Sequence, residues 1–160
     1  MERERKHNPA IQSKTGARLL SASQLPLFNM RPPRGYGVLT TIGRKTGKRR
    51  SRCVRAVRRD DKAYLVAIRG STTWLSNIRA NPEVQLRIRG GRFEGTARQL
   101  RESEREEAMK AYCGHPIGWF EYLEYLNWRK GRPTPAKIRE LHRTWFEQGA
   151  PLVIELRSSG

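Results

Sequence analysis

Short strand-like segments separated by close turns constrain the fold of this chain more than any other feature of its sequence. In residues 84–89, apolar side chains at 84, 86 and 88 alternate with Gln85, Arg87 and Arg89, which indicates a strand with one buried and one exposed face. Gly90-Gly91 follows as a two-residue hairpin signal. Residues 92–100 are therefore predicted to pair back onto this strand.

The other predicted strands are rich in β-branched residues, alternate in polarity or are wholly apolar. They lie at residues 37–42, 51–58, 63–68 and 151–156. Asp60-Asp61-Lys62 is the hairpin turn expected between the second and the third of them. Five or six short strands with such close turns predict a small antiparallel barrel.

Helical signals interrupt the strands once and then fill most of the last third of the chain. A short helix is predicted from a cap at Thr72 or Thr73 to Asn81-Pro82. A capping box at residues 103–106 and a Thr-Pro start at residue 134 predict further helices. These C-terminal helices cover residues 103–113, 119–130 and 134–148. The predicted fold class is mainly β with α, that is α+β.

The pattern predicts one domain, residues 19–160, with a helical insertion at about 103–148 and a flexible basic N-terminus at 1–18. The sequence contains no run of about 18 apolar residues, so no membrane-spanning helix is predicted. The charged start is not followed by an apolar signal core. Cys53 and Cys113 belong to no CxxC pair and are expected as buried thiols in a reducing cytosol. A cytoplasmic location is therefore expected, with association with an anionic membrane surface left open.

The excess of positive charge narrows the range of partners. Lys and Arg number 33 against 15 Asp and Glu, which gives a formal net charge of +18. Such a charge attracts nucleic acid, an anionic membrane surface, or phosphorylated and carboxylated small molecules. It also makes copies of the chain repel one another, and the sequence does not predict an oligomeric state.

A basic turn at residues 43–50 concentrates this charge, because five of its eight residues are Lys or Arg. Gly43 and Gly47 allow positive φ and expose backbone N–H groups, and Thr46 adds a hydroxyl. The combination is typical of an anion-binding nest reinforced by guanidinium groups. A merely solvated basic hairpin is the alternative. The spacing does not match a P-loop.

Two spaced motifs resemble the deazaflavin-dependent nitroreductase family. The first is LTTIGRKTG at residues 39–47, followed by Arg50, and the second is WLSNIRANPEV at residues 74–84. The hairpin at 90–92 followed by Thr96-Ala97-Arg98 is a third match. The resemblance covers about residues 37–112 and the closing strand at 151–156.

The resemblance implies an FMN-binding-like split β-barrel that binds reduced coenzyme F420, an 8-hydroxy-5-deazaflavin. Such enzymes pass a hydride to a quinone, a nitroaromatic or another conjugated acceptor. Carried over by position, the residues that would hold the phosphate and tail are Arg44, Lys45, Thr46, Gly47 and Arg50, with Arg69 as a further basic contact. The residues implied beside the ring are Thr73, Trp74 and Asn77, with core packing as the alternative for Trp74.

Three departures from the family pattern leave FMN as an alternative cofactor. The loop before Trp74 is several residues shorter than usual, Cys53 replaces a frequent Pro, and Arg52 is bulkier than the small polar residue common there. All three changes affect the expected ring pocket.

The chemistry of hydride transfer belongs to the coenzyme, so no catalytic triad or metal site is expected. His7, His115 and His142 lack ligand spacing, and His142 on an apolar stripe is expected to be packed. Aromatic residues of the predicted 119–130 helix, with a histidine before it, are proposed to wall the acceptor pocket: His115, Trp119, Tyr122, Tyr125 and Trp128. Tyr122 is the candidate proton donor. The alternative is that these rings only pack the extra helix onto the barrel.

Two other functions remain open. The charge and the exposed arginines on strands suit a nucleic-acid-binding module, although no motif of that class is present. A non-catalytic family member that only binds the coenzyme would share both motifs. Turnover with a quinone distinguishes that protein from an enzyme.

Overall fold

The computed structural model describes residues 31–68 and 73–157. The predicted flexible N-terminus at 1–18 and Arg69 lie outside these residues, so their predictions are not addressed by the structure. Every strand and helix predicted within the described ranges has a counterpart, with shifts at its ends, except that one predicted strand is divided in two.

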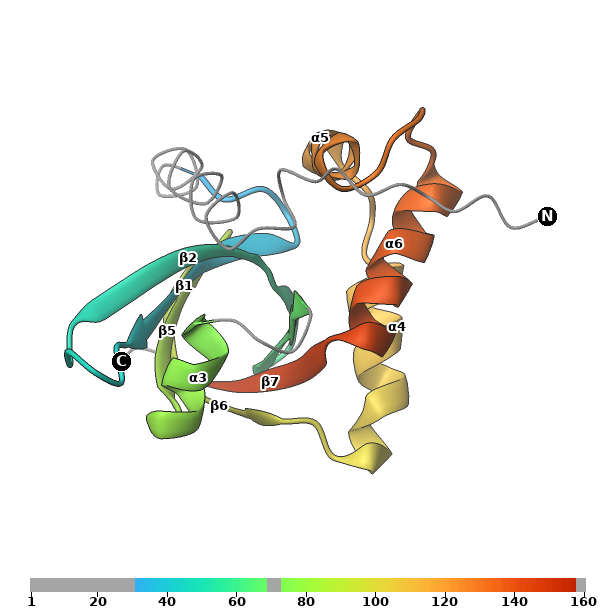
Figure 1. Ribbon diagram of the computed structural model, residues 1–160. Helices are drawn as coiled ribbons and strands as arrows, with labels where there is room; N and C mark the ends of the chain where they lie inside the picture. Colours follow the sequence, from blue (N-terminus) through green and yellow to red (C-terminus); the bar gives the residue numbers. More distant parts are fainter. Residues whose placement is uncertain (1–30, 69–72, 158–160) are drawn as a thin grey trace.

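The centre of the molecule is one seven-stranded antiparallel sheet, which curls into a half-barrel around α3 (Figure 1). Its strands follow one another in the order β2-β1-β5-β6-β7-β4-β3. Their bounds are Tyr36–Ile42 (β1), Arg49–Arg55 (β2), Val57–Arg59 (β3), Lys62–Ala67 (β4), Glu83–Ile88 (β5), Gly91–Gln99 (β6) and Ala150–Arg157 (β7). The last strand, β7, lies between β6 and β4 and joins the two halves of the sheet.

The single strand predicted at 51–58 is in fact two strands, and this prediction was wrong. β2 pairs with β1, whereas β3 pairs with β4, so the chain passes from one end of the strand order to the other at Ala56. The Ala56 N–H leaves the ladder and donates to the carbonyl of Gly35 at 2.9 Å. The alternation of polar and apolar residues continues through this crossing, which is why the sequence did not reveal it.

The barrel interior is filled from the strands and from α3 (Thr73–Ala80). Leu39, Leu86 and Ile154 are fully buried at its centre. Trp74 and Leu75 of α3 join the same cluster. Because β-strand side chains alternate between faces, the residues between these buried positions point outward and form the outer face of the sheet.

Three further helices gather on the side of the sheet away from α3 (Figure 1). They are α4 (Arg105–Gly114), α5 (Trp119–Trp128) and α6 (Pro135–Gln148). Thr134 caps α6 as predicted, because its hydroxyl oxygen accepts from the Lys137 N–H at 3.3 Å. The predicted capping box at 103–106 was wrong: a 3₁₀ turn at Glu102–Glu104 precedes α4, and the Glu104 carboxylate accepts from the Arg101 N–H at 3.0 Å.

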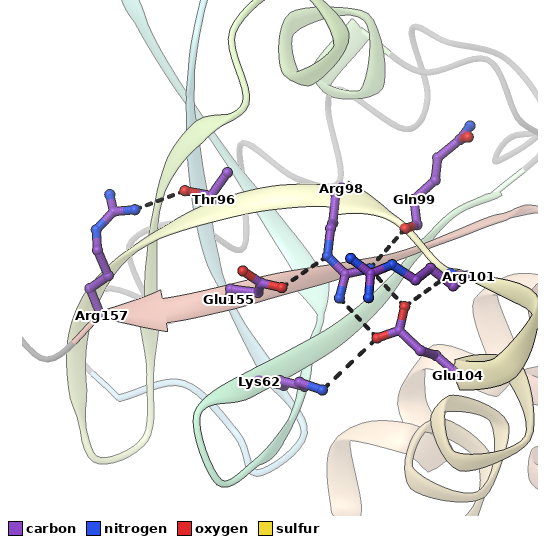
Figure 2. Close-up of polar contacts among 8 residues, drawn as sticks. All are labelled: Lys62, Thr96, Arg98, Gln99, Arg101, Glu104, Glu155 and Arg157. Carbon is purple, nitrogen blue, oxygen red and sulfur yellow. Dashed lines mark hydrogen bonds and ion pairs between the residues drawn. The ribbon is translucent and has the colours of Figure 1, made fainter.

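A network of ion pairs covers the outer face of β4, β6 and β7 (Figure 2). Arg98 contacts Glu104 at 2.7 Å and Glu155 at 2.9 Å, and the Lys62 ammonium lies 3.9 Å from Glu104. The two hydrogen bonds from Arg98 are the main reason that the pKa of Glu104 falls to about 2. The network fixes the start of α4 against the sheet and neutralises this part of the surface.

Gly149 is a tight packing point between α6 and β7, and its replacement by Ala is expected to destabilise the fold. An added Cβ would lie 2.6 Å from the Val66 side chain and 2.7 Å from two backbone oxygens. Overpacking of this kind costs about 1–3 kcal/mol. Gly114→Ala is the matched control, since a Cβ there meets nothing within 4 Å. Urea unfolding of both variants checks the prediction, and equal stabilities would contradict it.

Candidate functional site

The basic turn forms a compact loop between β1 and β2. The Gly43 N–H donates to the Lys48 carbonyl at 2.8 Å, and the Gly47 N–H donates to the Gly43 carbonyl at 2.8 Å. Gly47 has φ +68°, a conformation that side chains disfavour. An added Cβ on Gly43 would lie 2.8 Å from the hydroxyl of Thr46. Both glycines are therefore needed for the loop itself.

Thr46 shapes this loop as well as offering a hydroxyl. Its oxygen accepts from the Lys48 N–H at 3.2 Å, which leaves the hydroxyl hydrogen free to point to solvent. Arg44, Lys45 and Arg50 are exposed around the loop. The predicted anion-binding residues are thus brought together on one hairpin.

Asn77 links the two motifs that the sequence places more than thirty positions apart. Its amide nitrogen donates to the Thr41 hydroxyl at 3.1 Å, and its amide oxygen accepts from the Arg44 N–H at 3.2 Å. Asn77 is only 2% exposed. It supports the hairpin from inside the barrel.

The other residues implied beside the ring, Trp74 and Thr73, lie at the start of α3. Trp74 is 8% exposed and packs in the barrel core. Thr73 is exposed at the start of α3.

A groove of about 200 Å³ lies on the outer face of the strands beside the hairpin. It is lined by Val38, Thr40, Arg49, Ser51, Gln85, Arg87 and Arg92. The pairing register brings Arg87 opposite both Val38 and Arg92, and the hydroxyls of Thr40 and Ser51 lie 2.8 Å apart. Arg49 lies in the groove, whereas its neighbour Arg50 points to the opposite face of β2. The groove was not predicted from the sequence, although the alternation in 84–89 already put Gln85 and Arg87 on the exposed face.

Positive charge in the hairpin and the groove is not neutralised by the described residues. Within residues 31–68 and 73–157, Arg49, Arg87 and Arg92 form no ion pair, and neither do Lys45 and Arg50. No carboxylate of these ranges lines the groove. Guanidinium, ammonium, hydroxyl and backbone N–H donors together fit an anionic ligand that carries phosphate or carboxylate groups.

The aromatic residues proposed for the acceptor pocket do not share one face. Trp119 is 60% exposed and Tyr122 is 36% exposed, whereas Tyr125 is buried against α6. The Trp128 ring packs at 5.1 Å from that of Trp145, also on α6. His115 lies near Gly35, outside α5. Because residues spaced by three rotate around a helix, these rings are divided between the exposed side of α5 and its packing against α6.

A buried polar cluster joins α5 to the first strands. Arg55 donates to the Tyr112 carbonyl at 2.7 Å and pairs with Glu121 at 3.4 Å. The Tyr36 hydroxyl donates to the Glu124 carboxylate in a short hydrogen bond. The ring of Tyr36 also packs edge-on against Phe120, with centroids 4.6 Å apart. Hydrogen bonds, an ion pair and a ring contact thus hold one side of α5.

Two titratable groups in this cluster have strongly shifted pKa values. Burial raises the pKa of Glu124 to about 7, against the opposing effects of the Tyr36 hydrogen bond and Arg55. Burial, followed by the charge of Arg55, lowers the pKa of His142 to about 2. The His142 Nε2 atom is buried without a hydrogen-bond partner and lies 3.9 Å from Glu124. His142 is thus a packed neutral histidine, as expected.

Neither metal ligation nor a membrane-spanning helix is evident in the part of the chain that the structure describes. No group of three His, Cys, Asp or Glu side chains gathers there. None of its helices has the length and hydrophobicity needed to cross a bilayer.

A curled antiparallel sheet flanked by helices, with a basic hairpin at its edge, defines a split-barrel protein of the FMN-binding-like class. A solved structure of an F420H2-dependent reductase, FDR-A, matches with a TM-score of 0.50 at 26% identity, over 76% of this chain and 95% of that one. A structure described as a domain-swapped dimer matches with a TM-score of 0.52 at 21% identity, over 84% and 94%. A heme-binding protein from Mycobacterium smegmatis shares the fold with a TM-score of 0.51 at 12% identity, over 78% and 47%.

The family model for F420H2-dependent quinone reductases matches residues 6–129. The chain therefore belongs to this family of oxidoreductases, and its cofactor is F420.

The pKa of Glu124 is raised and that of His142 is lowered. We therefore expect the Glu124→Gln variant to show a stronger pH dependence of stability than the wild type. Between about pH 4.5 and 6.5 the folded state keeps the Glu124 proton that the unfolded state loses, which lowers stability as pH rises. Over the same range the unfolded state holds a His142 proton that the folded state does not hold, so stability rises as pH rises. The two effects offset each other in the wild type. In Glu124→Gln only the second remains, so stability rises by up to about 1.4 kcal/mol per pH unit.

Urea unfolding at several pH values measures these slopes. The other titratable groups of the cluster are unchanged between the wild type and Glu124→Gln, so they do not account for a difference in slope: Arg55, Glu121, Tyr36 and Tyr112. Glu106→Gln, which removes an 83% exposed carboxylate, serves as the control and should keep the wild-type slope. Parallel curves for the wild type and Glu124→Gln would contradict the assignment.

Asn77→Ala is expected to destabilise the fold and to loosen the hairpin. It leaves the Thr41 hydroxyl, which is 1% exposed, without its donor. An unsatisfied buried group costs about 1–3 kcal/mol. Amide exchange at Gly43 and Gly47 should also become faster. Thr41→Val keeps the Asn77 bond to the Arg44 N–H and should loosen the hairpin less. Unchanged exchange in Asn77→Ala would show that the hairpin holds its shape alone.

Proposed function

We propose that this protein transfers a hydride from reduced F420 to a quinone, a nitroaromatic or another conjugated acceptor. The observation that supports this function best is the basic hairpin of a chain of this family: Asn77 supports the hairpin, and its cations form no ion pair with another described residue. F420 carries phosphate and carboxylate groups, which these donors fit. When bound, the coenzyme supplies the hydride.

The residues of the chain bind and orient. In this proposal Lys45, Arg44 and Arg50 hold the phosphate and tail, with the Thr46 hydroxyl and the Gly47 backbone as uncharged donors. Arg69 stays a predicted further contact. Arg49, Arg87 and Arg92 add positive potential along the groove.

The proposal for the acceptor side of the site rests on the exposure of the aromatic residues of α5. Tyr125 and Trp128 pack against α6, so an acceptor can meet only the more exposed aromatics of this set, Trp119 and Tyr122. Tyr122 remains the proposed proton donor, with a hydroxyl that an acceptor on the outer side of α5 would reach. His115, near Gly35 and Arg55, would border this region from the linker before α5.

Binding and turnover assays test the proposal. Fluorescence titration should show binding of F420 in preference to FMN and to nicotinamide dinucleotides. Oxidation of reduced F420 should then depend on an added quinone. Binding of F420 without turnover would indicate a coenzyme carrier, and NADPH or FMN binding without F420 binding would reject the proposal. Retention on DNA with a steep salt dependence, in place of coenzyme binding, would favour a nucleic-acid-binding module.

Lys45→Ala and Arg50→Ala should each weaken F420 binding by roughly 1.5–3 kcal/mol, because each removes a hydrogen bond to a charged group. Arg101→Ala is the control for net charge, since residue 101 lies at the start of the α4 region, beside the ion-pair network (Figure 2). Arg49→Ala probes the groove face of the same strand. Equal losses in all four variants, measured by titration, would mean a diffuse electrostatic effect and not a defined site.

A further inference from the structure

Helix α5 turns its apolar side chains to solvent. The large exposed hydrophobic residues of the described chain all lie on it: Trp119, Tyr122, Leu123 and Leu126, with exposures of 60%, 36%, 51% and 51%. Their spacing of three, four and seven residues places them within about a third of the helix circumference. They form one continuous stripe, called here the α5 stripe. Exposed apolar surface of this kind marks an interaction site.

The acidic residues of the same helix point inward. Glu121 is 2% exposed and pairs with Arg55, and the Glu124 side chain is 18% exposed and bonds to Tyr36. A helix on the surface of a soluble protein normally shows the reverse arrangement. Arg55 stabilises Glu121 and Tyr36 stabilises Glu124 at inward-facing positions that apolar side chains normally occupy. The orientation of α5 is therefore set by specific buried polar contacts, and it leaves the stripe outside.

We propose that the α5 stripe docks the protein onto an anionic phospholipid bilayer, with Trp119 and the two leucines inserted at the interface. Trp and Tyr favour the boundary between headgroups and acyl chains. With both carboxylates turned inward, the stripe presents no negative charge to repel anionic lipid. The stripe shares Trp119 and Tyr122 with the proposed acceptor side, but its docking goes beyond the coenzyme chemistry and needs no bound coenzyme.

Charge selects the bilayer over a second copy of the chain. Two copies would each bring a formal charge of +18, whereas an anionic leaflet attracts it. The residues directly after α5 supply further cations, because Lys130 and Arg132 are exposed. Long basic side chains in this position can reach the headgroups while the apolar side chains insert.

Vesicle sedimentation with the full-length protein tests the proposal in the absence of coenzyme. Vesicles of phosphatidylcholine with phosphatidylglycerol should bind the wild type, and vesicles of phosphatidylcholine alone should bind it much less. Trp119→Ser/Leu123→Ser, which leaves the charge unchanged, should lower the partition coefficient by about tenfold or more, since burial of both side chains is lost. Lys130→Gln/Arg132→Gln should lower binding to the anionic vesicles only. Gln148→Ser, at the exposed end of α6 away from α5, is the neutral control and should bind as the wild type does.

Lipids brominated on the acyl chain locate the stripe directly. They should quench wild-type tryptophan fluorescence, and this quenching should disappear in Trp119→Phe, because Trp74 and Trp145 are buried and Trp128 packs against α6. Circular dichroism confirms that each variant is folded.

Three results would overturn the proposal. The first is an absence of binding or quenching with anionic vesicles at low salt. The second is binding that the double serine variant leaves intact and salt abolishes, which would mean attraction by the basic surface alone. The third is a wild-type dimer that Leu123→Ser converts to a monomer, which would make the stripe a subunit interface.

Discussion

A buried arginine at the crossing between the two ends of the sheet holds the parts of this molecule together. Arg55 ends β2, and two residues later Val57 pairs with β4 at the other end of the strand order. Its guanidinium binds the end of α4 through the Tyr112 carbonyl and α5 through Glu121. It also lies over the rings of Tyr36 and Tyr112, at 5.5 and 5.1 Å. The placement of two helices against this crossing thus depends on one side chain. Removal of such a group would leave Glu121 as an uncompensated buried charge.

The positions of the few carboxylates decide which cations are neutralised by ion pairs and which are not. Arg98 and Arg157 are paired on β6 and β7, and Arg55 is paired beneath α5. The hairpin and the groove receive no carboxylate partner among the described residues. The hairpin and the groove therefore keep a positive potential that the paired faces of β6 and β7 lack. The composition alone could not locate this difference.

The sequence predicted the local elements well, because turn residues and alternation are local signals. Gly90-Gly91, Thr134 and the strand at 84–89 are found where they were expected. It could not predict the crossing at Ala56 or the contacts of Asn77, which depend on strands distant in the sequence. The sequence also could not predict which face of α5 points inward. Nothing in the order of residues 119–128 says that Glu121 and Glu124 face inward, since that depends on Arg55 and Tyr36 from other strands.

The outward-facing apolar side of α5 has a consequence for how the protein behaves in a test tube. A molecule with such a surface is kept apart from its copies in dilute buffer mainly by its net charge, in the manner of a charged colloid. Added salt shortens the Debye length to about 8 Å at physiological ionic strength and weakens this repulsion. The high positive charge that attracts an anionic ligand therefore also keeps the molecules apart. Salt that weakens the attraction of the ligand will also weaken the repulsion between molecules.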